Sequence, residues 1–150
     1  MKYLIITVGI SICFFLFGYC DSIRGAALPE IIDSFRITYG AGGLLMVIHF
    51  IGYCSASLIF GSLSGKLKKR LLPIIANTVI LAGVLLYISV NRFLPFCLAA
   101  LAIGFGLGMY EFSGNTIIAD IYSQSRRGKF ANLVAGMHGI AAIIAPVIFG

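Results

Sequence analysis

The chain alternates long uncharged apolar runs with short polar connectors. Residues 37–65 and residues 71–91 contain no Asp, Glu, Lys or Arg. The connector Gly61–Arg70 covers the end of the first run and the residues before the second. In it, Lys66, Lys68, Lys69 and Arg70 fall within five residues. Each run is long enough to cross a hydrocarbon layer of about 30 Å as an α-helix. The pattern therefore predicts a membrane hairpin with a basic loop.

The same pattern predicts an all-α integral membrane protein. Five spans are expected over residues 3–28, 40–64, 71–90, 93–118 and 130–150. The polar segments between the later spans are the basic loop, the turn Asn91–Arg92 and a cytoplasmic loop over residues 119–129. Arg24, Glu30, Asp33 and Arg36 form a mixed-charge outer segment that begins at the end of the first span. We interpret residues 1–150 as a partial N-terminal transmembrane half, because an odd number of spans indicates the front part of a longer protein whose C-terminal part is absent.

The charge content agrees with a lipid environment. Hydrophobic residues make up 60% of the chain and charged residues 11%, whereas about a quarter of a soluble protein is charged. A chain with so little charge cannot cover its own surface in water. The net charge of +6 lies in short loops and not on one face, so it indicates membrane orientation and not nucleic-acid binding.

The cations also predict an orientation. Lys and Arg are retained on the cytoplasmic side of a membrane. The predicted topology puts Arg24, Arg36 and Arg92 outside, and it puts the other eight cations inside. We therefore expect a multi-pass protein of a bacterial-type inner (plasma) membrane with a cytoplasmic N-terminus.

Candidate chemistry is limited to a few polar residues inside the spans. The four cysteines lack metal-type spacing, and the chain has no zinc-binding His/Glu motif, nucleophile elbow or phosphate-binding loop. We expect no enzyme activity, cofactor or metal. A charge at the centre of a span costs about 2.5–3.5 kcal/mol on insertion scales, so each such residue needs a reason.

Glu111 is the clearest of these residues. Offsets of four, seven and eleven put Gly104, Gly108, Glu111 and Asn115 on one helical face. Glycines on this face allow a helix or a substrate to approach the backbone closely. The face is therefore expected to point toward protein or a central cavity. The alternative is that Glu111 only ties helices together.

Asp21 and His49 are further candidates. Asp21 lies near a stripe of small and polar residues, namely Thr7, Ser11, Gly18, Ser22 and Gly25. Its alternative is a helical pair with Arg24, three residues on. His49 shares a face with Gly52 and Tyr53, and it either joins a polar pathway or is a core residue. His138 in the last span has the same two alternatives.

The two carboxylates also have related positions along the chain. Asp21 and Glu111 lie equally far past the centres of the first and fourth spans. In an inverted three-helix repeat these two helices are equivalent, so the acids would lie at mirror-related positions about the midplane.

The basic loop resembles the signature loop of the major facilitator superfamily. Gly61-x-x-x-Gly65-Lys66-x-x-Lys69-Arg70 is similar to that family's Gly-x-x-x-Asp-Arg-x-x-Gly-Arg-Arg pattern. Gly65 replaces the acid of the pattern, and Lys68 stands where the second glycine is expected. The resemblance implies a twelve-helix fold of inverted three-helix repeats. It also implies a latch in which Asp120 pairs with the cations of the loop.

The fourth span resembles the fucose permease branch more specifically. The matching features are the stretch 104–115, Leu28-Pro29, Asn132 and Ala145-Pro146. This resemblance implies that Glu111 and Asn115 belong to a central cavity, with Glu111 linked to proton coupling and sugar binding. That branch's helix-one aspartate would fall at Gly25, one turn after Asp21.

The resulting expectation is a secondary active transporter. Its partners would be a small polar solute, a coupling proton and the bilayer, with sugar–proton symport as the leading reaction. One alternative is proton-coupled efflux of a drug or metabolite, which the Ala145-Pro146 region favours through its similarity to an antiporter motif. Another is a non-transporting membrane subunit or sensor.

Overall fold

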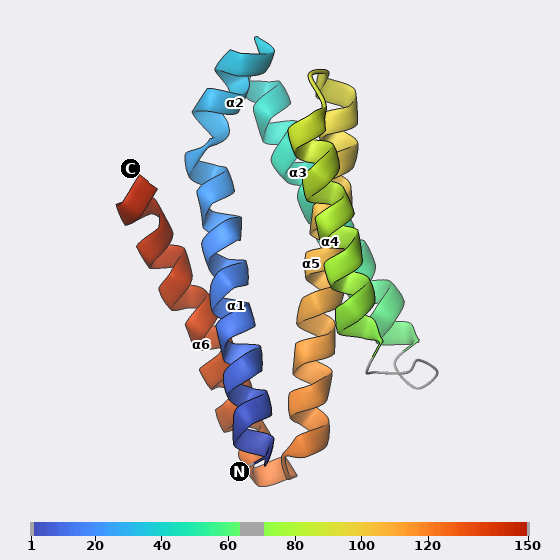
Figure 1. Ribbon diagram of the computed structural model, residues 1–150, viewed down its shortest axis with the longest axis vertical. Coiled ribbons are helices and arrows are strands. Elements are labelled where there is room, and N and C mark those ends of the chain that lie inside the picture. Colours follow the sequence, from blue (N-terminus) through green and yellow to red (C-terminus); the bar gives the residue numbers. More distant parts are fainter. Residues whose placement is uncertain (1, 64–70, 150) are drawn as a thin grey trace. The chain divides into compact units, whose positions relative to one another are not determined.

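The chain folds into α-helices joined by short connections (Figure 1). The structure, a computed structural model, describes residues 2–63 and 71–149. Its helices are α1 (Lys2–Ala26), α2 (Leu28–Phe35), α3 (Tyr39–Ser62), α4 (Leu72–Ser89), α5 (Phe93–Ile121) and α6 (Gln124–Phe149). All except α2 are long and apolar enough to cross a membrane. The predicted all-α membrane fold is confirmed, and the basic cluster at residues 64–70 lies outside the described residues.

Local signals start several of these helices. Pro29, Pro73 and Pro95 lie in the first turns of α2, α4 and α5, where the backbone N–H that proline lacks has no helical partner. Helix α3 begins after Thr38, whose hydroxyl accepts a hydrogen bond from the Ala41 N–H at 3.3 Å. This bond satisfies one of the N–H groups that the first turn leaves unpaired.

The first helix ends earlier than predicted. The sequence suggested one span over residues 3–28, but α1 stops at Ala26 and a separate helix, α2, follows. Pro29 has no N–H to donate to the carbonyl of Gly25, and its ring would crowd that carbonyl in a continuous helix, which explains a break at this point. Ile32 of α2 is buried while Glu30 and Asp33 are exposed, so this mixed-charge stretch is an amphipathic helix.

Helix α2 ends in a Schellman motif. The N–H of Ile37 bonds to the carbonyl of Ile32 at 3.1 Å, and the N–H of Arg36 bonds to the carbonyl of Asp33 at 3.2 Å. Arg36 has a φ of 51°, in the left-handed region where this motif usually has glycine. The two hydrogen bonds satisfy carbonyls at the helix end and offset the unfavourable backbone conformation.

The prediction of a loop over residues 119–129 is wrong. Only Tyr122 and Ser123 separate α5 from α6, and the last helix starts six residues before the predicted position near residue 130. The carbonyl of Ser123 accepts hydrogen bonds from the N–H groups of Arg126 and Arg127, both at 2.9 Å. Arg and Lys have good helix propensity. The exposed basic segment can therefore form the start of α6 although it has no apolar face.

The chain divides into two compact units. The first comprises Met1–Pro29 and Gly114–Gly150, and the second comprises Glu30–Ser113. Helix α5 contributes to both: its residues up to Ser113 belong to the second unit and the rest to the first.

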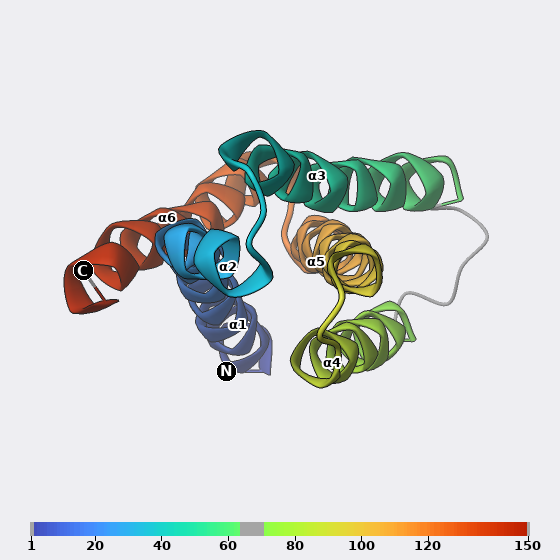
Figure 2. The same cartoon turned by 90° about the horizontal axis from the view of Figure 1, so that it is seen from above.

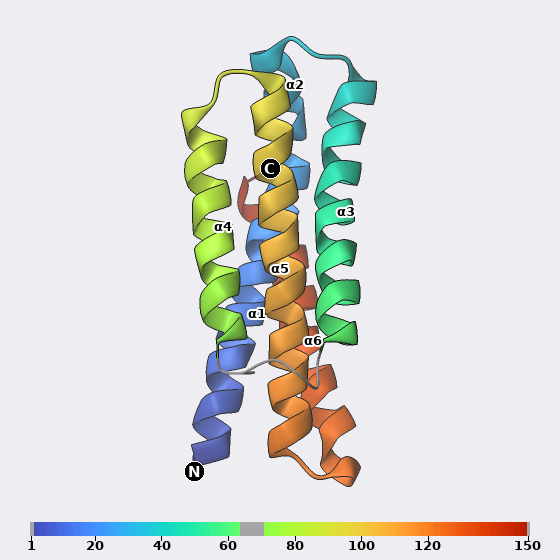
Figure 3. The same ribbon diagram turned by 90° about the vertical axis from the view of Figure 1, so that its right-hand side faces the viewer.

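In the second unit, α5 lies between α3 and α4 (Figures 2 and 3). Half of its span is buried, against 17–22% for the other four spans. Ala99, Ile103 and Gly106 of α5 lie against α4. A Cβ added at Gly83 of α4 would come within 2.7 Å of Ile103 Cγ1, and one at Gly106 within 2.6 Å of Ile80 Cγ1.

The opposite side of α5 packs against α3, which runs in the same direction. Gly104 lies against the backbone carbonyl of His49, and Gly108 lies one turn later against that of Tyr53. Gly52 of α3 lies reciprocally against the carbonyl of Leu101. We call these contacts the α3–α5 seam. Side chains at these glycines would force the two backbones apart.

Aromatic and small side chains fill the space at both ends of this unit. One buried cluster contains Leu45, Phe96, Cys97 and Ala100, and the other contains Ala56, Leu72, Ala76 and Met109. In the first cluster the Tyr87 and Phe96 ring centroids are 3.8 Å apart. Dispersion contacts of this kind hold α3, α4 and α5 together in lipid, where the hydrophobic effect between helices is absent.

In the first unit, α1 and α6 lie side by side and run in the same direction (Figure 1). Gly18 of α1 lies against the backbone carbonyl of His138 in α6. The Phe17 and His138 rings meet edge to face, with centroids 4.7 Å apart. On α5, Gly114 lies against Phe14, with 2.6 Å between an added Cβ and Phe14 Cε2. This unit is therefore also packed around glycines.

We expect Gly52→Ala to destabilise the α3–α5 seam. The added methyl would collide with the Leu101 carbonyl and lie 3.0 Å from the Phe105 nitrogen, and overpacking typically costs about 1–3 kcal/mol. Gly43→Ala is the matched control, because nothing lies within 4 Å of a Cβ there and alanine favours a helix. Thermal unfolding in detergent should show a lower Tm for Gly52→Ala only. Equal Tm values would contradict the seam.

Candidate functional site

The glycine face predicted on α5 meets another helix. Gly104 and Gly108 are buried against the backbone of α3, so at these positions the close approach is by a helix and not by a substrate. On an α-helix, Glu111 and Asn115 continue the same face toward the C-terminus. The candidate site therefore starts where the glycine contacts end.

Glu111 lies one turn beyond Gly108 on α5. Its side chain is half-buried, in the helix with the most buried span of the five. It is neither sealed in the helix core nor fully open. Acids in membrane spans usually face protein or a water-filled cavity, and the partial burial of Glu111 agrees with such a position.

Asn115 follows Glu111 by four residues and is exposed. It belongs to the part of α5 that lies in the first unit. An amide supplies two donors and an acceptor, so it can recognise hydroxyl groups of a polar solute. Its spacing from Glu111 puts the two side chains on adjacent turns of one face.

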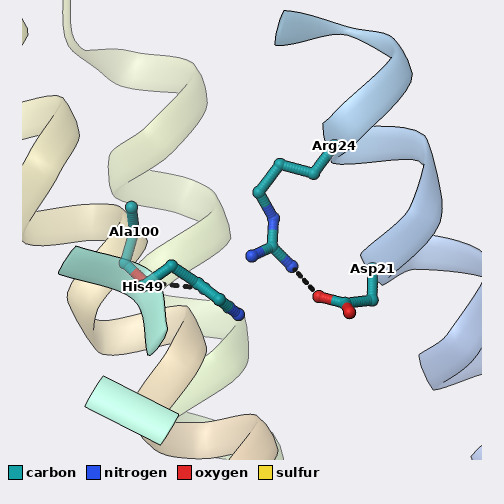
Figure 4. A network of polar contacts seen from close by, with 4 residues as sticks. All are labelled: Asp21, Arg24, His49 and Ala100. Atoms are coloured by element: carbon teal, nitrogen blue, oxygen red, sulfur yellow. Dashed lines mark hydrogen bonds and ion pairs between the residues drawn. The ribbon is translucent and has the colours of Figure 1, made fainter. Parts of the chain in front are cut away.

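His49 is a buried member of the α3–α5 seam (Figure 4). Its Nδ1 lies 3.1 Å from the backbone carbonyl oxygen of Ala100 on α5. Because a carbonyl oxygen only accepts, Nδ1 donates this hydrogen bond. The contact agrees with the interpretation of His49 as a core residue that ties α3 to α5.

Asp21 forms an ion pair within α1 (Figure 4). Its Oδ1 accepts a hydrogen bond of 2.7 Å from Arg24 Nη2, one turn on. The Arg24 side chain is 12% exposed and that of Asp21 is 31% exposed. The helical-pair alternative for Asp21 is therefore the geometry that the structure has.

The cytoplasmic loop motif is only partly described. Gly61, near the end of α3, and Asp120, near the end of α5, are both exposed. The remaining members, Gly65, Lys66, Lys69 and Arg70, lie outside the described residues. The latch between Asp120 and the loop cations stays a prediction.

The predicted cavity residues belong to different parts of the chain. Asp21 lies in the first unit, and His49 and Glu111 lie in the second. Their grouping around one cavity, and the mirror relation between Asp21 and Glu111, stay predictions. Two of these residues have hydrogen bonds close to them in the fold: Asp21 bonds Arg24, and His49 bonds the carbonyl of Ala100.

One polar cluster was missed by the sequence reasoning. The Thr7 and Tyr122 oxygens are 2.7 Å apart, although 115 residues separate them. The Tyr122 ring also stacks on Phe130, with centroids 3.8 Å apart. Thr7 was recognised as part of a polar stripe, but nothing in the pattern indicated Tyr122 as its partner.

Comparison with known proteins identifies the family. Residues 10–150 match the sequence pattern of the Major Facilitator Superfamily. The chain is similar to efflux pump dotC of Dothistroma septosporum (strain NZE10 / CBS 128990), with 24% identity over 147 residues, which cover 97% of this chain and 25% of that protein. It is also similar to the uncharacterized MFS-type transporter YfiU of Bacillus subtilis (strain 168), with 26% identity over 142 residues, 95% of this chain and 27% of the relative.

A third relative is efflux pump hmp6 of Hypomyces subiculosus, with 26% identity over 153 residues, 100% of this chain and 26% of the relative. The chain thus spans about a quarter of the length of these relatives. No solved structure matches the chain significantly. The resemblance to the fucose permease branch stays a prediction. The match over residues 10–150, together with five apolar helices, shows that the chain belongs to the Major Facilitator Superfamily.

Proposed function

We propose that the protein is a secondary active transporter of a small solute, with Glu111 as the group that exchanges the coupling proton. The observation that supports this most is the half-buried carboxyl on α5, directly beyond the buried glycine contacts. Membership of a transporter superfamily supports the general activity. The chain spans about a quarter of the length of these relatives, so the activity of a whole transporter is part of this proposal.

The proposed role of Glu111 follows from the response of a carboxyl to water. Burial in an apolar environment favours the neutral form, and access of water or a cation favours the ionised form. A carrier that opens a water path first on one side and then on the other changes this balance during its cycle. A half-buried position next to a packed seam needs only a small movement to gain or lose water.

The other polar residues have supporting roles in this proposal. Asn115 contacts the solute, because its amide is exposed on the same α5 face as Glu111. Asp21 stabilises Arg24 through their 2.7 Å ion pair, and His49 stabilises the α3–α5 seam through Ala100. The pair is half-buried, and if Asp21 had a direct role in transport, Arg24 would need a new partner.

Two directions of transport are compatible with this proposal. The efflux pumps among the relatives favour proton-coupled export of a drug or metabolite. The resemblance of residues 104–115 to the fucose permease branch favours sugar–proton symport. The two reactions differ in the direction of proton movement. Coupled export moves protons in the direction opposite to the solute, whereas symport moves protons in the same direction as the solute.

A membrane sensor or non-transporting subunit is the alternative from another class. In that case Glu111 would only bond neighbouring helices, and its ability to ionise would be unimportant. We also propose a bacterial-type inner membrane and a cytoplasmic N-terminus. The distribution of cations along the sequence supports this orientation.

Glu111→Gln should abolish proton-coupled transport and preserve folding, because the amide keeps the size of the side chain and most of its hydrogen bonding. The assay uses energised everted vesicles from cells that express the protein. A panel of sugars and lipophilic cations is added, and a fluorescent dye reports the internal pH. An exporter dissipates the acid interior when its solute is added, whereas a symporter acidifies de-energised vesicles when its solute is supplied with protons outside.

The matched control is Glu30→Gln, because Glu30 is an exposed acid in the first turn of α2. It should retain the wild-type signal. If Glu111→Gln accumulated or expelled solute against a gradient as wild type does, Glu111 would be a structural tie and not the coupling group.

Asn115→Ala should weaken solute binding while proton coupling persists. Loss of one hydrogen bond worth about 1 kcal/mol corresponds to about a fivefold higher half-saturation concentration. Asn77→Ala is the control, because Asn77 is an exposed amide on α4. Initial transport rates over a range of solute concentrations provide the measurement. A lower maximal rate with unchanged half-saturation would argue against a binding role.

Cysteine labelling tests the orientation. In a variant that lacks the four native cysteines, Arg127→Cys should resist a membrane-impermeant thiol reagent in intact cells and react after permeabilisation. Asn91→Cys should react in intact cells, since Asn91 lies in the connection between α4 and α5 and is exposed. The reverse pattern would invert the proposed topology.

A further inference from the structure

The last helix, α6, has sides of different character. It packs along α1 in the first unit, and Val134, Ala141 and Ala145 on one side of it are fully buried. Another side carries exposed cations at the start of the helix and exposed aliphatic side chains along the rest. We call this side the α6 stripe. Its members are Arg126, Lys129, Leu133, Ile140 and Val147.

Helical geometry puts these five residues in one line. Their offsets from Arg126 are three, seven, fourteen and twenty-one residues, so all five lie within about 60° of one another around the helix axis. Leu133 is 52% exposed, Ile140 is 50% exposed and Val147 is 80% exposed. Both cations are exposed as well. The α6 stripe therefore combines a charged start with an open apolar surface.

The spacing along α6 matches one leaflet of a bilayer. Lys129 and Ile140 are eleven residues apart, which is about 16 Å by helical rise, and half of the hydrocarbon core is about 15 Å thick. Cationic side chains extend toward the headgroups while their methylene groups stay on apolar surface. A phosphate near Lys129 would therefore have its acyl chain beside Leu133 and Ile140.

The cations of the α6 stripe are not neutralised within the described part of the chain. Helix α6 contains no Asp or Glu, and neither Arg126 nor Lys129 forms an ion pair with a described residue. The nearest acid along the sequence is Asp120 in α5, the predicted partner of the loop cations. Like charges three residues apart on a helix repel each other, so an anion at this position would be stabilising.

The neighbouring exposed face of α6 has a different composition. It carries small and polar residues, namely Asn132, Gly136, Gly139 and Pro146. No described atom lies within 4 Å of a Cβ added at Gly136 or Gly139. Small residues are typical of helix–helix contacts in membranes, whereas lipid chains are as apolar as leucine. Further protein is therefore expected on the glycine face, and lipid on the α6 stripe.

We propose that the α6 stripe binds an anionic phospholipid, with the headgroup phosphate on Arg126 and Lys129 and an acyl chain along Leu133 and Ile140. A guanidinium can donate two parallel hydrogen bonds to one phosphate, and an ammonium adds a point charge. Anionic lipids are concentrated in the cytoplasmic leaflet, which the proposed orientation puts at this end of α6. The lipid site is independent of Glu111 and of the direction of transport.

Photocrosslinking of the full-length protein tests this site directly. Mixed micelles are titrated with phosphatidylglycerol that carries a photoreactive group in its acyl chain, and mass spectrometry locates the crosslinks. We expect crosslinks at Leu133 or Ile140. Each cation near an anionic headgroup strengthens binding about fivefold, so the double variant Arg126→Gln/Lys129→Gln should raise the half-saturating lipid concentration about 25-fold. Equal crosslinking at these residues by photoreactive phosphatidylcholine would overturn the proposal.

Arg127→Gln is the matched control for Arg126→Gln. It removes one cation from the same turn, but residue 127 lies about 100° from Arg126 around the helix axis and outside the α6 stripe. Arg126→Gln should weaken crosslinking about fivefold, and Arg127→Gln should leave it close to wild type. Equal losses in the two variants would show that general charge attraction, and not the α6 stripe, holds the lipid.

Two other results would also overturn the proposal. Absence of crosslinks at both Leu133 and Ile140 in the wild type would show that another part of the full-length protein covers this face. Complete displacement of the lipid by millimolar inorganic phosphate would show an anion site in which the acyl chain has no part. Neither measurement needs a transported solute or a proton gradient, so its outcome is separate from that of the Glu111 experiment.

Discussion

Close contact between helix backbones is the constraint on which this structure depends. In lipid, apolar side chains gain little by leaving their surroundings, so helices associate through packing and interhelical hydrogen bonds. At the α3–α5 seam, glycines let carbonyl oxygens of one helix touch the backbone of the other, a geometry that also permits weak Cα–H···O bonds. The Gly18–His138 contact follows the same principle in the first unit. Polar contacts then add specificity at each interface.

The sequence predicted most of the architecture because its strongest signals are periodic. Uncharged runs of about 20 residues predict spans with few alternatives, and the described residues form five helices that are long and apolar enough to cross a membrane. The glycines of α5 were assigned to a protein-facing side by helical spacing, and Gly104 and Gly108 do contact α3. The shared face of His49, Gly52 and Tyr53 was also predicted, and the structure uses it as the other half of the seam.

What could not be predicted depends on pairings between distant residues. The Thr7–Tyr122 hydrogen bond joins residues far apart in sequence, and no local pattern relates them. The predicted start of α6 is wrong because a basic, uncovered stretch is typical of a loop, whereas the helix propensity of Arg and Lys lets the helix begin at Gln124. At the candidate site, spacing put Glu111 and Asn115 on one face, but the distinction between a tie and a coupling group depends on water access, which the pattern of residues does not encode. For His49, only three-dimensional packing reveals the backbone partner, the carbonyl of Ala100.

The parallel register of the seam has a consequence for how this chain can vary. His49 pairs with Gly104, and Tyr53 pairs with Gly108, at the same sequence offset. Connections between α3 and α5 can change length without disturbing this match, because both helices keep their own phase. A single-residue insertion between Gly108 and Glu111 would be different. Each residue turns an α-helix by about 100°, so the carboxyl would rotate onto another side of α5 while the glycine contacts above it remained intact. An insertion or deletion between Gly108 and Glu111 would therefore move the carboxyl to another side of α5 and leave the packing of α5 on α3 unchanged.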